Sequence, residues 1–344
     1  MASSVDCNTS NCSRVFLTYE PSLAGNAVLL GLFVVLIPIT LVLGSRYRSS
    51  VFATAVATGL ALEVMGYIGR VLLHGSPNSR GDFIIFLLGT ILGPTCICGA
   101  IFLVMPRIVA VYGEEFRSWR PAWYLFLFYA LTIISLVLEL VGAIVSTVLD
   151  EDDLVTTGTR VLVVGLTVQI VSLAIFVAHA VMFAIALRTR RHVLDPKYSY
   201  VYTNGYFKIF MVVFSIATVL LILRTAYRIV NVAEGFESSI AQDETLFLVL
   251  DGAMVLIATV LLLTFFPARA FGQSWSQTSA RRLSQVQAQP PHPASPYIPS
   301  SARPSPTDNR MSMKSAMTSS SPQKSQHQSP QTQQRNMVDS DALW

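Results

Sequence analysis

Seven long apolar stretches dominate the first 267 residues of this 344-residue chain. Each is about 20 residues or longer, enough to cross about 30 Å of hydrocarbon at about 1.5 Å per helical residue. Apolar residues cover every face of each stretch, unlike the one-sided pattern of a soluble amphipathic helix. The pattern predicts an all-α, polytopic membrane protein with seven transmembrane helices, near residues 24–44, 51–73, 83–106, 122–149, 161–187, 207–230 and 245–267.

The charges of the short loops predict the orientation of these helices, because Lys and Arg in short loops are retained on the cytoplasmic side. Three alternate loops are basic and contain Arg46, Arg107 and Arg188, whereas the loops between them hold the acidic residues 150–153 and the carboxylates of 234–244. The N-terminus is therefore expected outside and the C-terminus in the cytoplasm. Residues 1–22 show no cleavable signal pattern, so the first helix is expected to serve as its own anchor.

The expected exterior segment contains two features of extracellular chains. Asn8 and Asn11 each begin an Asn-x-Ser/Thr triplet, which makes them glycosylation candidates, although such triplets also occur by chance. Cys7 and Cys12 would lie in oxidising surroundings, where they could pair with each other or with a partner.

Residues 268–344 differ in composition from the rest of the chain. They contain 16 Ser, 11 Gln and 9 Pro, and beyond Trp275 they lack the apolar periodicity that could bury a core. We therefore expect three parts: a short extracellular segment (1–22), a seven-helix membrane domain (23–267) and a disordered Ser/Pro/Gln-rich cytoplasmic tail (268–344).

Composition narrows the function further. Charged residues make up 13% of the chain, against about 25% in an average soluble protein, which excludes an ordinary cytosolic enzyme. The net charge of +4 comes from the tail, so the basic residues form no stripe for nucleic acid. Only His179 of the five histidines lies in a span, and no ATP-binding G-x-x-x-x-G-K-[ST] motif is present. No enzyme activity, metal or cofactor is expected.

Polar side chains inside the predicted helices are the candidate functional residues, because inserting an ionisable group into a span costs about 2.5–3.5 kcal/mol. Three on the second helix recur at i, i+4 and i+7, and three on the sixth at i, i+3 and i+4, so each set shares one helix face. Other candidates come from the fourth, fifth and seventh helices. The full set is Glu63, Tyr67, Arg70, Glu139, Gln169, Arg224, Tyr227, Arg228 and Asp251.

Counting from the helix ends places these side chains between the membrane midplane and the outer surface, whereas the cytoplasmic halves are almost wholly apolar. This predicts a polar cavity that opens to the outside or is buried between helices in the outer half. A structural alternative is that Arg70, Arg224 and Arg228 extend to the outer interface, with Glu63 and Asp251 as their counter-ions.

The polar residues lie in recognisable motifs. The second helix contains E-V-M-G-Y-I-G-R, and the last two helices contain R-T-A-Y-R-I-V-N and E-T-L-F-L-V-L-D. From about Tyr19 to Pro267 the chain resembles the fungal lipid-translocating exporter family, seven-helix proteins related to aminocholesterol-resistance and sphingoid long-chain-base translocator proteins. It departs from that family at Asn231, where members usually carry Glu. It also departs in the fourth helix, which usually reads D-x-x-S-L-x-x-Q-x-x-G and here has Thr132, Ser135, Glu139 and Gly142 at those places.

The resemblance implies transport or translocation of an amphipathic molecule, such as a sphingoid base, a sterol-like compound or another lipid or toxin, with resistance conferred by export. The acids would receive a cationic head group or a proton, and the arginines would hold those acids or a lipid phosphate. The expected partners are membrane lipids or amphipathic small molecules. The expected location is the plasma membrane, or alternatively an endomembrane. A facilitator, a scramblase and a proton-coupled carrier are all compatible with the sequence.

Two other classes of function fit the same residues. One is a seven-helix receptor or sensor that binds an amphipathic ligand and signals through its cytoplasmic loops and tail. The other is a structural or regulatory membrane protein that changes lipid asymmetry indirectly.

Overall fold

The computed structural model describes residues 20–76, 79–112, 121–149, 151–189, 196–235, 238 and 242–278. All regular secondary structure in this part of the chain is helical. It contains seven helical spans that are long and apolar enough to cross a membrane, which confirms the predicted all-α class and indicates an integral membrane protein. The candidate sites Asn8 and Asn11, Cys7 and Cys12, and tail residues 279–344 lie outside the described residues.

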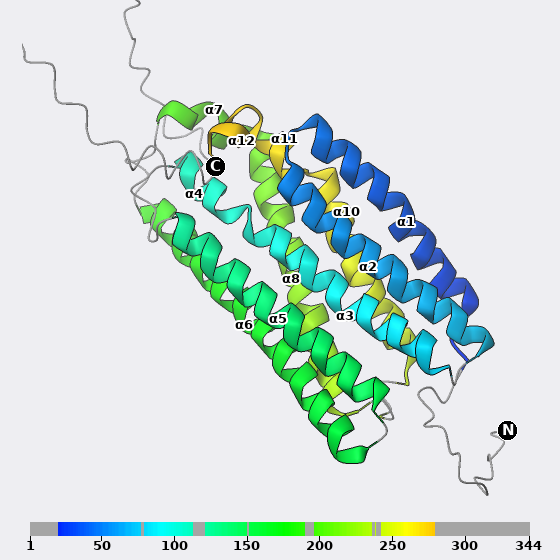
Figure 1. Cartoon of the computed structure of the whole chain (residues 1–344). Helices are drawn as coiled ribbons and strands as arrows, with labels where there is room; N and C mark the ends of the chain where they lie inside the picture. Colours follow the sequence, from blue (N-terminus) through cyan, green and yellow to red (C-terminus); the bar gives the residue numbers. More distant parts are fainter. Residues whose placement is uncertain are drawn as a thin grey trace, which may run out of the picture.

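The spans form an elongated bundle, and several short helices lie at one end of it (Figure 1). The first six spans are α1 (Leu23–Arg46), α2 (Ser50–Gly75), α3 (Arg80–Phe102) continued by α4 (Met105–Tyr112), α5 (Pro121–Val148), α6 (Asp152–Thr189) and α8 (Gly205–Ala233). The seventh comprises α9 (Glu244–Leu246), the π-helical segment η4 (Phe247–Ala253) and α10 (Met254–Thr264). The remaining elements are η3 (Pro196–Tyr198), α7 (Ser199–Tyr202), α11 (Pro267–Phe271) and α12 (Ser274–Gln277).

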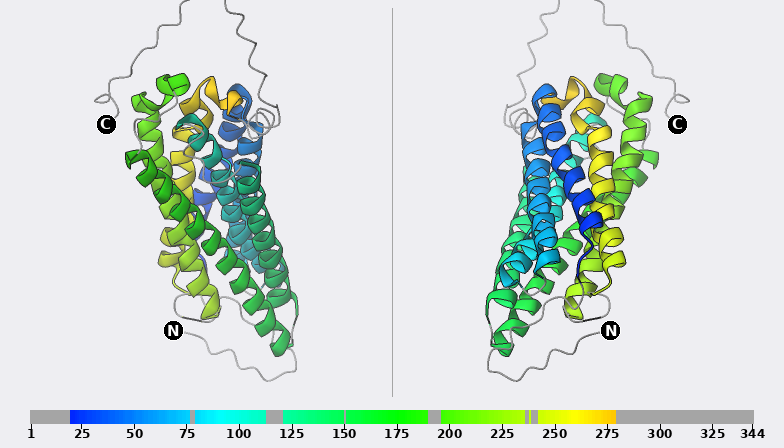
Figure 2. Two further views of the ribbon diagram at one scale, coloured as in Figure 1. Left: turned by 90° about the vertical axis from the view of Figure 1, so that its left-hand side faces the viewer. Right: turned by 90° about the vertical axis from the view of Figure 1, so that its right-hand side faces the viewer.

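Each span packs against the spans before and after it in sequence. Helix α1 also packs against α10, beside which it lies in the right-hand view of Figure 2, so the contacts close the bundle into a ring. Helix α3 also touches α6 and α8, so it occupies the most enclosed position. In its most apolar window 72% of the residues are buried, against 22% for α1. Apolar side chains such as Val28, Phe126 and Val212 are exposed on the outside of the bundle, where lipid would surround them.

The closest helix contact joins α2 to α3 through small residues. A Cβ atom on Gly89 would overlap the backbone of Gly66, and one on Gly59 would lie 2.7 Å from the carbonyl oxygen of Gly93. Small residues at these positions let two helix backbones touch, as in the small-xxx-small packing of membrane helices. Gly89 and Gly93, which are four residues apart, therefore form the face of α3 that packs against α2.

Three element boundaries differ from those expected. Helix α6 begins at Asp152 rather than near residue 161, because its first turns are polar but carry acidic residues that favour a helix N-terminus. The third span is interrupted after Phe102, and its second part, α4, carries Pro106 in its first turn. The packed part of the chain also continues beyond residue 267, since Phe271 and Trp275 are buried.

Candidate functional site

Six of the nine candidate residues meet between α2, α3, α8 and η4. We call this set the ionic cluster; it consists of Glu63, Tyr67, Arg70, Arg224, Arg228 and Asp251. None of the six is more than 2% exposed. The three arginines therefore do not extend to the surface. Of the two arrangements expected for the polar groups, a cavity open to the outside and burial between helices, the structure has the second. With every acid and arginine ionised, the cluster carries one more positive than negative charge.

Asp251 lies between the two arginines of α8. Its Oδ1 atom is 2.7 Å from Nε of Arg224, and its Oδ2 atom is 3.9 Å from Nη1 of Arg228. The shorter contact is close but not aligned as a hydrogen bond, so it is an ion pair. These contacts join the sixth span to the seventh inside the bundle, where removing one partner would leave an uncompensated charge.

Helix α3 supplies two acceptors to the same arginines through one residue, Thr90. Arg224 donates to the Thr90 carbonyl oxygen, and Nη2 of Arg228 donates to the Thr90 hydroxyl over 2.6 Å. The carbonyl is available because the residue four positions later is Pro94, which has no N–H to complete the helical hydrogen bond. The proline therefore has a specific role here: it frees an acceptor for a buried arginine.

Two phenylalanines hold Arg70. Its guanidinium lies 4.3 Å from the ring centroid of Phe247 and 4.8 Å from that of Phe86, within cation–π range of both. The two rings also contact each other edge to face at 5.4 Å. Arg228 lies 5.8 Å from Phe86 and 5.9 Å from Phe247, so one aromatic pair serves arginines from two spans.

Asp251 lies in η4, the π-helical segment of the seventh span. Over Phe247–Ala253 the backbone bonds span five residues instead of four, which turns this segment relative to the α-helix that follows. Phe247 and Asp251 both belong to this segment, and Gly252 beside Asp251 packs against the Tyr67 side chain. Such π segments occur frequently at functional sites.

Glu63 and Tyr67 are the least satisfied members of the cluster. Oε1 of Glu63 and the Tyr67 hydroxyl are buried and have no hydrogen-bond partner among the described residues. Glu63 packs against Gly93, and the Tyr67 ring stacks on Phe33 with centroids 5.4 Å apart. Glu63 interacts electrostatically with Tyr67 and with the arginines of α8. The α2 face therefore presents two unoccupied acceptors beside fixed positive charges.

Glu139 belongs to a second polar group, on the side of α3 that faces α5 and α6. Its carboxyl oxygens lie 2.9 Å from the hydroxyls of Ser135 and Thr95, and the Ser135 hydroxyl is also 2.8 Å from the Gly165 carbonyl. Arg224 interacts electrostatically with Glu139 as well as with the ionic cluster. The five predicted helices thus contribute to two adjoining polar groups rather than to one.

The last two candidates lie at the margins of these groups. Gln169 of α6 is buried beside Cys98 of α3, and its amide makes no aligned hydrogen bond within the described residues. Tyr227 of α8 is 9% exposed, and its hydroxyl accepts a hydrogen bond from Asn231 over 3.3 Å. Asn231, where relatives were expected to carry Glu, therefore bonds within its own helix.

Sequence reasoning missed the neutral partners of the charged residues. These are Thr90 with Pro94, the ring pair Phe86 and Phe247, and the hydroxyls of Thr95 and Ser135. One signal was present in the sequence: a proline within a helix leaves the carbonyl four residues before it without a donor, which marks position 90 as an acceptor. The others depend on how the helices are rotated against each other.

The fold and the ionic cluster define a class: an integral membrane protein of seven helical spans with charged side chains buried between them. A family model described as RTA1 like protein matches residues 56–274, which include all nine candidates, and the chain belongs to this family. The expected resemblance to a fungal family is therefore confirmed.

Three of the curated relatives that this chain matches are proteins of Saccharomyces cerevisiae. A sphingoid long-chain base transporter, RSB1, is 27% identical over 298 residues, covering 78% of this chain and 77% of the relative. Protoporphyrin uptake protein 1 is 22% identical, covering 59% of this chain and 64% of the relative, and Protein RTM1 is 22% identical, covering 60% and 64%. No solved structure gives a significant match.

Proposed function

We propose that this protein is a transporter of amphipathic lipids with a cationic head group, of the sphingoid-base kind, and that the ionic cluster holds the head group during passage. The observation that carries the proposal is the pair of buried, unpartnered acceptors on α2: Oε1 of Glu63 and the hydroxyl of Tyr67. An ammonium group has three donors and no acceptor, so it matches both atoms. The relative named as a sphingoid long-chain base transporter supports this substrate class.

The neighbouring charges indicate different roles for the two acids of the ionic cluster. Asp251 is already engaged by Arg224 and Arg228, so its charge is largely compensated. No ion pair joins Glu63 to another residue that the structure describes, so it is the acid best placed to accept a cation or a proton. The arginines would then hold the spans in register and attract any phosphate that the substrate carries.

The ionic cluster is closed, so passage requires the helices around it to rearrange. We propose the seventh span as the moving element, because its π-helical segment lies directly against Tyr67. We propose that the N-terminus lies outside, because the basic loops, which are retained on the cytoplasmic side, are at the opposite end of the bundle. We further propose export from the plasma membrane, with resistance to toxic amphiphiles as its consequence and without an enzymatic step.

Reconstitution of the purified full-length protein into liposomes tests the proposal. The measurement is movement of a fluorescent sphingoid base between leaflets, with wild type, Glu63→Gln and Glu139→Gln compared at equal protein content. Glu63→Gln should reduce the rate at least about tenfold, because the amide cannot supply the anionic acceptor. Glu139→Gln should retain most of the rate, because the hydroxyls of Thr95 and Ser135 already engage its carboxyl.

Two results would overturn the proposal. If folded wild-type protein moves no cationic or anionic amphiphile, direct transport fails and the sensor interpretation takes its place. If Glu63→Gln moves the lipid at the wild-type rate, transport stands but the ionic cluster is not its site.

A further inference from the structure

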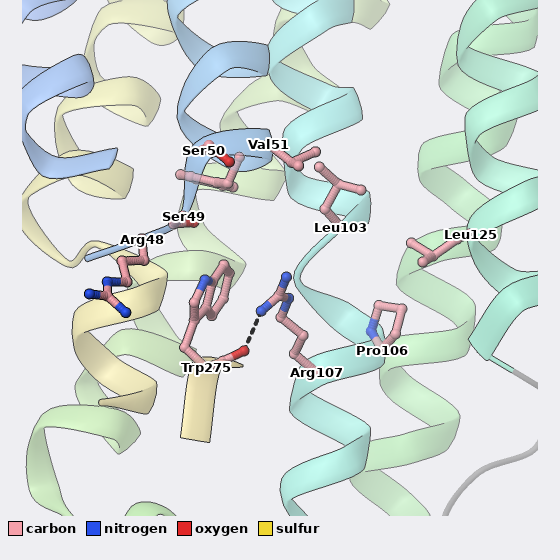
Figure 3. Close-up of a pocket in the computed structure, with 10 residues that line it drawn as sticks. Arg48, Ser49, Ser50, Val51, Leu103, Pro106, Arg107, Leu125 and Trp275 are labelled. Carbon is pink, nitrogen blue, oxygen red and sulfur yellow. Dashed lines mark hydrogen bonds between the residues drawn. The ribbon is translucent and has the colours of Figure 1, made fainter. Parts of the chain in front are cut away.

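A pocket lies far from the ionic cluster and from the Glu139 group, at the end of the bundle where the short helices lie. It is a cavity of about 440 Å³ between the α1–α2 junction, the break between α3 and α4, helix α5 and helix α12 (Figure 3). None of the nine candidate residues lines it. We call it the junction pocket.

The described charged residues that line the junction pocket have one sign. Arg48 and Arg107 line it, and no acidic residue among the described part of the chain does. Neither arginine forms an ion pair within the part of the chain that the structure describes. Arg107 donates from Nη1 to the Trp275 carbonyl oxygen over 2.5 Å, and its guanidinium lies 3.6 Å from the centre of the Trp275 ring. The tryptophan thus fixes Arg107 in place without neutralising its charge.

The N-terminus of α2 also opens into this pocket. The first turn of a helix leaves N–H groups without backbone acceptors, and the side chain of the N-cap residue, Ser49, does not cap them. Ser50, Val51 and Phe52 of this turn line the pocket. Ser49, the residue before the helix, lines it too; it is only 3% exposed, and its hydroxyl has no hydrogen-bond partner among the described residues. Free N–H groups, a free buried hydroxyl and a helix N-terminus together suit an anion.

The backbone holds Arg48 in a conformation that favours glycine. Its φ is 51°, and the turn after α1 is closed by Ser49 N–H bonding to the Gly44 carbonyl at 2.9 Å and Arg48 N–H bonding to the Ser45 carbonyl at 3.3 Å. This is the hydrogen-bond pattern of a helix C-terminus that usually carries glycine at the left-handed position. An arginine there costs about 1 kcal/mol of backbone strain, which points to a role for its side chain.

The rest of the wall is apolar. Val51, Leu103, Pro106 and Leu125 line the pocket on the side of the interrupted third span. The pocket lies where α1 ends and α2 begins, at the depth where lipid head groups meet the ends of membrane helices, and Trp275 beside it is typical of that interface. A ligand suited to both walls has a compact anionic group joined to an alkyl chain.

We propose that the junction pocket binds the phosphate head group of an anionic lipid, with Arg48, Arg107 and the first turn of α2 on the phosphate and the apolar wall along the alkyl chain. This site is separate from the ionic cluster and does not depend on the transport function proposed above.

Calorimetric titration of the purified, delipidated full-length protein in a non-ionic detergent tests the proposal. The probes are dioctanoyl phosphatidic acid, dioctanoylglycerol, which lacks the phosphate, and inorganic phosphate, which lacks the chains. Only phosphatidic acid should bind. Arg48→Gly and Arg107→Gln should each weaken binding about tenfold or more, because each removes charge-assisted hydrogen bonds to the phosphate.

Two features make this test specific. Arg48→Gly suits the local φ, so the variant should fold at least as well as wild type. Arg46→Gln is the matched control, because Arg46 is an exposed arginine at the same end of the bundle that does not line the pocket. It should change the affinity less than twofold.

Several outcomes would overturn the proposal. If dioctanoylglycerol binds as tightly as phosphatidic acid, the pocket does not recognise the phosphate. If inorganic phosphate binds as tightly, the pocket does not recognise the alkyl chains. Wild-type affinity in both pocket variants would place the phosphate elsewhere. Displacement of the lipid by a peptide of residues 299–312 phosphorylated at Ser305 would assign the pocket to a phosphorylated segment instead.

Discussion

The two halves of the ionic cluster differ in how fully their polar atoms are bonded. On α8 and η4, the arginines are engaged by Asp251, and Thr90 of α3 accepts a hydrogen bond from each of them. On α2, Glu63 and Tyr67 are equally buried, but Oε1 of Glu63 and the tyrosine hydroxyl have no partner within the described residues. The first half is held by ion pairs and hydrogen bonds, although Nε of Arg228 has no hydrogen-bond partner among the described residues, whereas the second half leaves its acceptors unused.

This difference separates stability from function. A buried polar group without a partner costs about 1–3 kcal/mol, so the α2 half weakens the fold, whereas the bonded half joins three spans. We infer that the bonded half maintains the arrangement of the helices and that the unbonded half is retained for a ligand. The two halves should therefore respond in opposite ways to removal of their polar groups.

The largest effect is expected from Asp251→Asn. Two buried guanidinium groups would lose their carboxylate, which typically costs about 3–5 kcal/mol. Urea unfolding of the purified protein in detergent micelles measures this loss in the free energy of unfolding. Asp153→Asn, at an exposed position in the first turn of α6, is the control and should cost less than about 1 kcal/mol. A similarly small loss in Asp251→Asn would show that the bonded half does not hold the spans together.

The second-largest loss of stability is expected when Thr90, the uncharged partner of the two arginines, is substituted. Thr90→Val keeps the side-chain shape but removes the hydroxyl that accepts from Arg228, and should cost about 2 kcal/mol. Thr218→Val is the matched control: Thr218 is also buried, and the one hydrogen bond of its hydroxyl within the described residues goes to the Phe214 carbonyl in its own helix. The same unfolding measurement applies. Equal losses in the two variants would mean that the bond to Arg228 adds nothing.

A smaller effect is expected when the two prolines inside helices are compared. Pro38→Ala in α1 supplies an N–H to the carbonyl four residues earlier, to which no described side chain donates, so it should raise the free energy of unfolding by about 1–3 kcal/mol. Pro94→Ala should gain about 1 kcal/mol less, because the Thr90 carbonyl already accepts from Arg224. Thermal unfolding in detergent ranks the two variants. A larger gain at Pro94 would show that the arginine does not use the freed carbonyl.

The sequence predicts the fold better than it predicts the partners within the site. Seven apolar stretches mark seven spans, because the length needed to cross a membrane is fixed by lipid thickness. The spacing of Glu63, Tyr67 and Arg70 also identifies the face of α2 that turns inward. These properties are local, so a single chain segment is enough to reveal them.

The pairing of residues across helices could not be predicted in this way. Asp251 meets Arg224 from η4, whose backbone departs from α-helical geometry, and the apolar residues around Asp251 give no sign of that change. Glu139 was grouped with the other acids by depth alone, whereas the position of α3 between the helices directs it toward Thr95 and Ser135. Depth follows from counting residues, but rotation about the helix axis follows from packing.

The smallest effect should come from the unbonded half, in Tyr67→Phe. The substitution removes a buried hydroxyl that has no described partner, so the free energy of unfolding should stay the same or rise by up to about 1 kcal/mol. Tyr227→Phe is the matched control on the bonded side: its hydroxyl accepts from Asn231, and its loss should cost about 1 kcal/mol. Urea unfolding of both variants gives the sign of each change in the free energy of unfolding.

A loss above about 1 kcal/mol in Tyr67→Phe would mean that the hydroxyl is bonded in the folded protein, for instance through a buried water. The contrast between the two halves would then disappear. A neutral or positive change, together with slower lipid movement in liposomes, would show that this hydroxyl is retained for the ligand rather than for the fold.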